Sequence, residues 1–373
     1  MTRRPSQALR KLLRLAARPM KSDRGRGGIV VHAYRGYGSA SQVYLMGRVF
    51  HQPSLGLPLA EGTLARDLAD VVRRGVRWGV GGAEVTLRLN GSTLTVITDR
   101  DGYYDAWMPL DEPLPQDRSW HRAELDVRVD DAHTVSGSAE VYVPPPAVDM
   151  VVISDIDDTV MYTGVANKLK MFYRLFLEKA DRRTAFPGVA PFYQALFAGA
   201  DGQRRRPMLY VSRGPWSIYE VLEAFFQRNR IPVGPILFLR EWGLSLQRPW
   251  PRKATDHKAR VIEQMLSLYD TLPFVLIGDS GQQDPETYAR IVREHPGRIH
   301  TIYIRNINQD ASRAAAIDRL AEEVGEDGCS LLLASSSVQM AEHAHDQGLI
   351  SSAGLEAVRR SPDLADTRDG DAA

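Results

Sequence analysis

The stretch Val151–Thr159, VVISDIDDT, constrains the fold of this chain more than any other part of the sequence. It begins with mostly β-branched residues without polar alternation, which predicts a strand buried on both faces inside a parallel sheet. The carboxylates of Asp155, Asp157 and Asp158 then crowd its carboxyl end. Ligands of open α/β sheets bind beyond the carboxyl ends of the strands. We therefore expect an α/β domain with a functional site here, and the competing interpretation is a solvated acidic turn.

The crowding of these carboxylates also predicts a cation. Like charges at this spacing repel one another unless an opposite charge joins them. A hard divalent ion such as Mg²⁺ is bound through a few carboxylates together with waters and substrate phosphate. The sequence therefore predicts Mg²⁺ as the cofactor.

Length and composition restrict the class of protein. A chain of 373 residues is long enough for two domains, each with its own core. A formal net charge of +1 argues against nucleic acid as a partner of the whole chain. The single cysteine, Cys329, excludes an internal disulfide, which favours a reducing and hence cytoplasmic compartment. No apolar run is long enough to cross a bilayer.

Residues 1–28 are strongly basic, with Asp23 as their only acid. Leucines at helical spacing alternate there with arginine and lysine, a pattern typical of short amphipathic helices on anionic membrane surfaces. Two interpretations stay open, namely peripheral contact with the inner membrane surface and a disordered basic tail without a partner.

Residues 29–146 have the pattern of a small antiparallel β-sandwich. The predicted strands are 29–34, 42–50, 83–89, 92–98, 123–129 and 136–143, separated by turn signals such as Asn90-Gly91. Thr98–Pro109 resembles a signature of transthyretin-like and carboxypeptidase-regulatory-like sandwiches. We found no catalytic constellation in this region, which favours a binding or positioning role.

Further polar residues follow other buried strands of the predicted domain at 147–350. Ser212 and Arg213 follow the strand 208–211, and a hydroxyl, a guanidinium and a helix start together make a phosphate seat. His257 and Lys258 are expected to open a helix, and Asp279 and Asp284 follow the strand 274–277. The last segment, 351–373, is expected to be a partly disordered tail.

The order DIDDTV, SRGPW, HK and GDSGQQDPE resembles the four motifs of the haloacid dehalogenase superfamily of phosphotransferases. More narrowly, over roughly residues 150–350 it resembles the catalytic domain of the actin-patch phosphatidate phosphatases and their bacterial relatives. The resemblance implies a doubly wound parallel sheet with a small helical cap insert.

The resemblance also implies a role for each motif residue. Asp155 would be the nucleophile that forms an aspartyl-phosphate, and Asp157 the general acid and base. The phosphate would be bound by Thr159, Ser212 and Lys258, to which the chemistry of phosphate binding adds Arg213. Mg²⁺ would be held by Asp155, Asp157, Asp279 and Asp284.

The expected activity is Mg²⁺-dependent hydrolysis of a phosphomonoester, with a lipid phosphate such as phosphatidate as the substrate. The short inserts between motifs leave room only for a small cap, which suits a substrate within something large. Alternatives are a phosphatase for proteins or polynucleotide ends, and a non-catalytic protein that acts through its β-region. A receiver-like signalling module would carry its acidic pair and its phosphorylated aspartate on different strands, whereas Asp155 and Asp157 share one.

Overall fold

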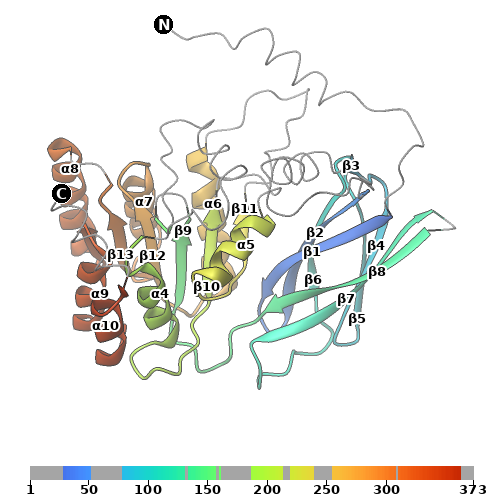
Figure 1. Ribbon diagram of the computed structural model, residues 1–373, viewed down its shortest axis with the longest axis horizontal. Helices are drawn as coiled ribbons and strands as arrows, with labels where there is room; N and C mark the ends of the chain where they lie inside the picture. The colour runs from blue at the N-terminus through green and yellow to red at the C-terminus, as the bar shows by residue number, and fades with distance from the viewer. Residues whose placement is uncertain are drawn as a thin grey trace, which may run out of the picture.

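Figure 1 shows the computed structural model of the protein, in which two β-sheets lie next to each other. The structure describes residues 28–51, 78–130, 133–156, 159–160, 186–212, 219–238, 254–307 and 310–362. Of Trp78, Val221 and residues 254–257 only the backbone belongs to this description.

The first sheet joins eight strands by hydrogen bonds and lies on the right of Figure 1. Its strands are β1 (Ile29–Gly38), β2 (Gln42–His51), β3 (Trp78–Gly79), β4 (Glu84–Leu89), β5 (Ser92–Ile97), β6 (Tyr103–Pro109), β7 (Trp120–Asp130) and β8 (His133–Tyr142). Their order is β3-β2-β1-β8-β7-β4-β5, and β6 pairs with β2. Strands β1 and β8 are parallel, whereas the other described pairs are antiparallel.

The hairpin of β4 and β5 shows how the sequence specifies this sheet. Alternate residues Val85, Leu87 and Leu89 are buried, as the period of two predicts. The turn residues Asn90 and Gly91 both have positive φ, 48° and 84°, as a two-residue hairpin turn requires. Strands β3 and β6 were not among the predicted strands. Since hydrogen bonds link all eight strands in one sheet, the β-sandwich stays a prediction.

The second sheet is entirely parallel. Its strands are β9 (Val151–Asp155), β10 (Met208–Ser212), β11 (Ile236–Phe238), β12 (Phe274–Asp279), β13 (Ile299–Arg305) and β14 (Ser330–Ala334), in the order β11-β10-β9-β12-β13-β14. Every residue of β9, β10, β11 and β12 is buried, which explains their uninterrupted apolar sequences. The predicted α/β class is confirmed at this level.

Helices alternate with these strands along the chain. They are α4 (Val189–Ala198), α5 (Tyr219–Arg228), α6 (Ala254–Leu268), α7 (Asp284–Glu294), α8 (Ala311–Glu326), α9 (Ser337–Asp346) and α10 (Ser352–Arg359). Two packed groups are apparent, one of α4, α9 and α10 and the other of α6, α7 and α8. Right-handed connections place such groups on opposite faces of the sheet where the strand order reverses.

That reversal lies between the neighbouring strands β9 and β12. From β9 the chain proceeds outward to β10 and β11, and after β12 it proceeds the other way to β13 and β14. The connections on the two sides therefore diverge beyond the carboxyl ends of β9 and β12. Such switch points are the usual ligand sites of open α/β sheets.

The two sheets are joined by a continuous contact. Tyr34, Tyr37 and Met46 of the first sheet belong to the same buried apolar cluster as the second sheet and its helices. The backbone N–H of Arg35 donates to the Tyr219 hydroxyl at 3.1 Å. The Arg35 side chain also pairs with Glu223 of α5 and Glu140 of β8. The first sheet therefore packs directly on α5.

Some predictions about the helices are wrong, and others concern residues that the structure does not describe. Helix α6 begins at Ala254, so Lys258 lies in its second turn, and the expectation that His257 and Lys258 open the helix is wrong. Helices α7 and α8 were not predicted, and α10 falls within the expected tail. Residues 1–27 of the basic segment lie outside the described residues. None of the described helices is long and apolar enough to span a membrane.

Candidate active site

The carboxyl end of β9 presents Asp155, which is fully buried. Its backbone is held on two sides. The Ser154 hydroxyl donates to the Asp155 carbonyl at 2.7 Å, and because it has a single hydrogen, the Tyr193 hydroxyl must donate to it at 2.6 Å. The next residue, Ile156, donates its N–H to the Val211 carbonyl of β10 at 3.1 Å. The backbone that carries the Asp155 carboxylate is therefore held in place by hydrogen bonds.

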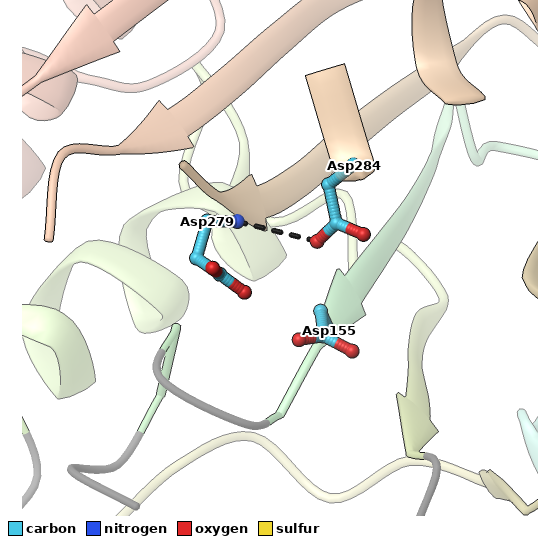
Figure 2. A group of neighbouring side chains, drawn as sticks. All are labelled: Asp155, Asp279 and Asp284. Atoms are coloured by element: carbon cyan, nitrogen blue, oxygen red, sulfur yellow. Dashed lines mark hydrogen bonds between the residues drawn. The ribbon is translucent and has the colours of Figure 1, made fainter. Parts of the chain in front are cut away.

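Asp279 and Asp284 flank the loop that follows β12. Asp279 ends the strand, Asp284 begins α7, and both are buried. The Asp279 N–H donates to Asp284 Oδ2 at 3.2 Å, drawn as the dashed line in Figure 2. The Gly281 N–H donates to Asp279 Oδ1 at 2.8 Å. Gly278 permits this approach, because a Cβ there would lie 2.8 Å from the Asp284 Cβ.

The three carboxylates converge on one point. Figure 2 shows Asp155, Asp279 and Asp284 arranged around a common space, and one oxygen of each lies within 4.8 Å of the others. The buried Lys258 ammonium lies 3.0 Å from Asp155 Oδ1 and also hydrogen-bonds to Asp284 Oδ1. The ammonium of Lys258 therefore contacts two of the three carboxylates.

The negative charge of the cluster affects the neighbouring Tyr288. Burial, followed by the charges of Asp284, Asp155 and Asp279, raises the pKa of the Tyr288 phenol well above its ordinary value. The Gln282 side-chain amide donates to Asp155 Oδ2 at 3.4 Å. The two oxygens of the Asp155 carboxylate therefore contact different groups, Lys258 at Oδ1 and Gln282 at Oδ2.

Thr159 is buried beside the end of β13. Its carbonyl accepts from Arg305 Nε at 3.2 Å, and Arg305 Nη2 donates to Ser337 Oγ at 3.0 Å. The Arg305 guanidinium also lies 4.3 Å from the centre of the Phe186 ring. The Thr159 hydroxyl is buried without a hydrogen-bond partner in the described part of the chain, as expected of a group that awaits a ligand.

The predicted site residues can now be placed. The structure brings together Asp155, Lys258, Asp279 and Asp284, and puts buried Ser212 at the end of β10, next to β9. Asp157 and Arg213 lie outside the described residues.

Gln282 and Arg305 were missed as candidates by the sequence analysis. Arg305 carried the signal that identified Ser212, a polar residue at the end of a buried strand. Gln282 lies in a quoted motif, but its contact with Asp155 depends on the path of the loop.

Part of the chain is similar to known proteins. Residues 150–306 match the family described as phosphatidate phosphatase APP1, catalytic domain. The phosphatidate phosphatase APP1 of Saccharomyces cerevisiae is 30% identical over 178 residues, covering 48% of this chain and 29% of the yeast protein. An uncharacterized protein of Schizosaccharomyces pombe is 29% identical over 159 residues, covering 43% of this chain and 25% of that protein.

These matches cover only part of each protein. The chain spans less than a third of the length of these curated relatives. Among solved structures, a carbohydrate acetylesterase from Xanthomonas citri aligns with 80% of this chain and 75% of its own, at 12% identity and a TM-score of 0.26. A TM-score of this size supports no relationship of fold.

Proposed function

We propose that the protein is a phosphoric monoester hydrolase that acts on phosphatidate, since residues 150–306 match the family described as phosphatidate phosphatase APP1, catalytic domain. The products would be diacylglycerol and phosphate. The observation that carries the proposal is the cluster of Asp155, Asp279 and Asp284 with Lys258 at the switch point between β9 and β12.

The donor set fits Mg²⁺. Magnesium prefers oxygen ligands and is bound in proteins through a few carboxylates, with waters and substrate phosphate completing its coordination. The described cluster offers three buried carboxylates. Asp155, Asp279 and Asp284, with Asp157 from the first motif, would hold the ion. When bound, it would neutralise phosphate charge and allow a carboxylate to approach.

The protein's own residues would carry the remaining steps. Asp155 would attack phosphorus and form an aspartyl-phosphate, which water then hydrolyses. Asp157 would protonate the departing alkoxide and afterwards take a proton from the attacking water. The ammonium of Lys258, which contacts Asp155, and the hydroxyls of Thr159 and Ser212 would bind the phosphoryl oxygens. Arg213 would add a guanidinium to this phosphate seat.

A haloacid dehalogenase-like fold of the second sheet and its helices is part of the proposal. In support, the motif residues of β9, β10 and β12 all lie at the same edge of a parallel sheet. The basic residues 1–28 would contribute peripheral contact with an anionic membrane, where the lipid substrate resides.

The test is phosphate release from phosphatidate in mixed micelles, with Mg²⁺ or EDTA, and from a soluble phosphomonoester in parallel. We expect Mg²⁺-dependent release from the lipid and its loss in Asp155→Asn. Asp117→Asn serves as the control, because that carboxylate is 72% exposed and remote in sequence from the motifs. Release from the soluble ester alone would overturn the lipid assignment, and release from neither would favour the non-catalytic alternative.

A further inference from the structure

Arg313 occupies an unusual place for a cation. It lies in the first turn of α8, whose N-cap is Asp310, and this end of a helix dipole disfavours positive charge. Its side chain is only 23% exposed. A partly buried cation at an unfavourable helix position calls for a compensating interaction, and the structure shows where it is made. Arg313 also lies beyond residue 306, where the match to the catalytic family ends.

The Arg313 guanidinium binds the loop between Asp279 and Asp284. Its Nε donates to the Ser280 carbonyl at 2.9 Å, and its Nη2 to the Gln282 carbonyl at 2.8 Å. Its two terminal nitrogens also form a forked pair with Glu286, the third residue of α7.

The fork attaches Arg313 to α7 as well as to the loop. One side chain therefore joins the loop and the start of α7, both of which carry the acidic cluster.

The other side of the same loop is held by β13 and the residues after it. The Ser280 N–H donates to the Arg305 carbonyl at 2.9 Å, and Ser280 Oγ accepts from the Ile307 N–H at 3.1 Å. These bonds hold the loop at Ser280 only. The Gln282 carbonyl accepts from Arg313, and the side-chain amide of the same residue donates to Asp155.

We propose that Arg313 is a positioning residue for the metal site, and that it sets the spacing of the Asp279 and Asp284 carboxylates by holding the loop between them. The inference rests on the proposed function, since it concerns the same Mg²⁺ site. Groups that orient metal ligands typically contribute about 10- to 100-fold to metal affinity. In the described part of the chain Arg313 hydrogen-bonds to the backbone of the loop and to Glu286, and these bonds transmit its effect on the spacing of the two carboxylates. Its charge also attracts Asp279 and Asp284 from a distance.

The experiment is calorimetric titration of the full chain with Mg²⁺, without substrate, for the wild type and for Arg313→Gln. Arg293→Gln is a matched control, because Arg293 and Glu323 form the same kind of α7–α8 ion pair at 3.2 Å, away from the loop. We expect Mg²⁺ binding to weaken about tenfold or more in Arg313→Gln and to stay unchanged in Arg293→Gln. Glu286→Gln, which leaves the two carbonyl contacts in place, should bind Mg²⁺ nearly as the wild type does.

The alternatives are distinguishable. Equal Mg²⁺ affinity in the wild type and Arg313→Gln overturns the positioning role alone. A wild type that takes up no Mg²⁺ overturns the proposed metal site and this inference together. If circular dichroism shows that Arg313→Gln is unfolded, Arg313→Lys decides, because it keeps the charge but cannot make both carbonyl bonds with the fork. Wild-type affinity in a folded Arg313→Lys would then contradict the proposal.

Discussion

Lys258 is buried between two of the acidic residues and has a structural as well as a chemical role. Removing one partner of a buried ion pair leaves the other charges uncompensated, which typically costs about 3–5 kcal/mol. Lys258→Met should therefore lower the free energy of unfolding by about this amount in EDTA. Mg²⁺ should restore part of the loss, because it supplies positive charge to the same carboxylates.

Chemical unfolding in EDTA and in Mg²⁺ measures this effect. Arg360→Gln is the control, since the Arg360 side chain is 79% exposed in its pair with Glu356, and such a pair contributes at most about 1 kcal/mol. An equal loss of stability in both buffers would show that Lys258 and the metal do not share the carboxylates.

The residues of the site were predictable to the extent that topology alone brings them together. Asp155, Ser212 and Asp279 follow buried strands, and parallel strands bring their carboxyl ends to one edge of the sheet. Lys258 was identified by motif order, although its position in α6 was misjudged. The contacts of Gln282, Arg305 and Arg313 could not be predicted, because they depend on how the loops after β12 and β13 pass one another.

At the scale of elements, the glycines of α8 and of the end of β12 should respond to alanine in opposite ways. Gly278→Ala places a methyl group against Asp284, and overpacking of this kind costs about 1–3 kcal/mol. Gly325→Ala adds a methyl group in open space within α8 and should stabilise the protein by about 0.5–1 kcal/mol. Urea unfolding of both variants tests the pair.

Mg²⁺ titration then separates packing from positioning in the same variants. We expect Gly278→Ala to bind Mg²⁺ weakly and Gly325→Ala to bind it as the wild type does. Wild-type binding in Gly278→Ala would show that Asp284 can move without consequence for the site.

Strands of the parallel sheet were easier to predict than helices, for a physical reason. The strands of the parallel sheet are buried on both faces and therefore stand out as apolar runs. Helix α8 buries Ile317 and Val324 among its 16 residues, so few apolar positions mark the face that it packs against the protein. Strand β6 was not predicted, because Thr98–Pro109 was interpreted as a signature with a turn and not as a strand.

At the scale of the whole molecule, three histidines predict a dependence of stability on pH. Burial lowers the pKa of His121, His300 and His343, and Arg206 lowers that of His300 further. As the pH falls below about 6.5, the unfolded chain takes up protons that the folded protein does not. The free energy of unfolding should therefore decrease as the pH is lowered from 7.5 to 5.5.

Urea midpoints at the two pH values measure this dependence. The His343→Gln variant should show a shallower dependence, because one of the three groups no longer titrates. A midpoint that rises on acidification would contradict the prediction. Carboxyls of lowered pKa, such as Asp149 and Glu286, stabilise the folded protein above their ordinary pKa values of 3.8 and 4.5. They lose this contribution only as the pH falls below those values.

The parallel pairing of β1 with β8 has a consequence for biosynthesis. About 95 residues separate the end of β1 at Gly38 from the start of β8 at His133. A ribosome adds roughly 5–20 residues per second, so one edge of β1 waits several seconds for its partner strand during translation. Its contacts through Arg35 with α5 must wait longer still, until Tyr219 and Glu223 have been made. The nascent chain therefore exposes a strand edge that the finished protein covers, and this interval is when a chaperone would have most to protect.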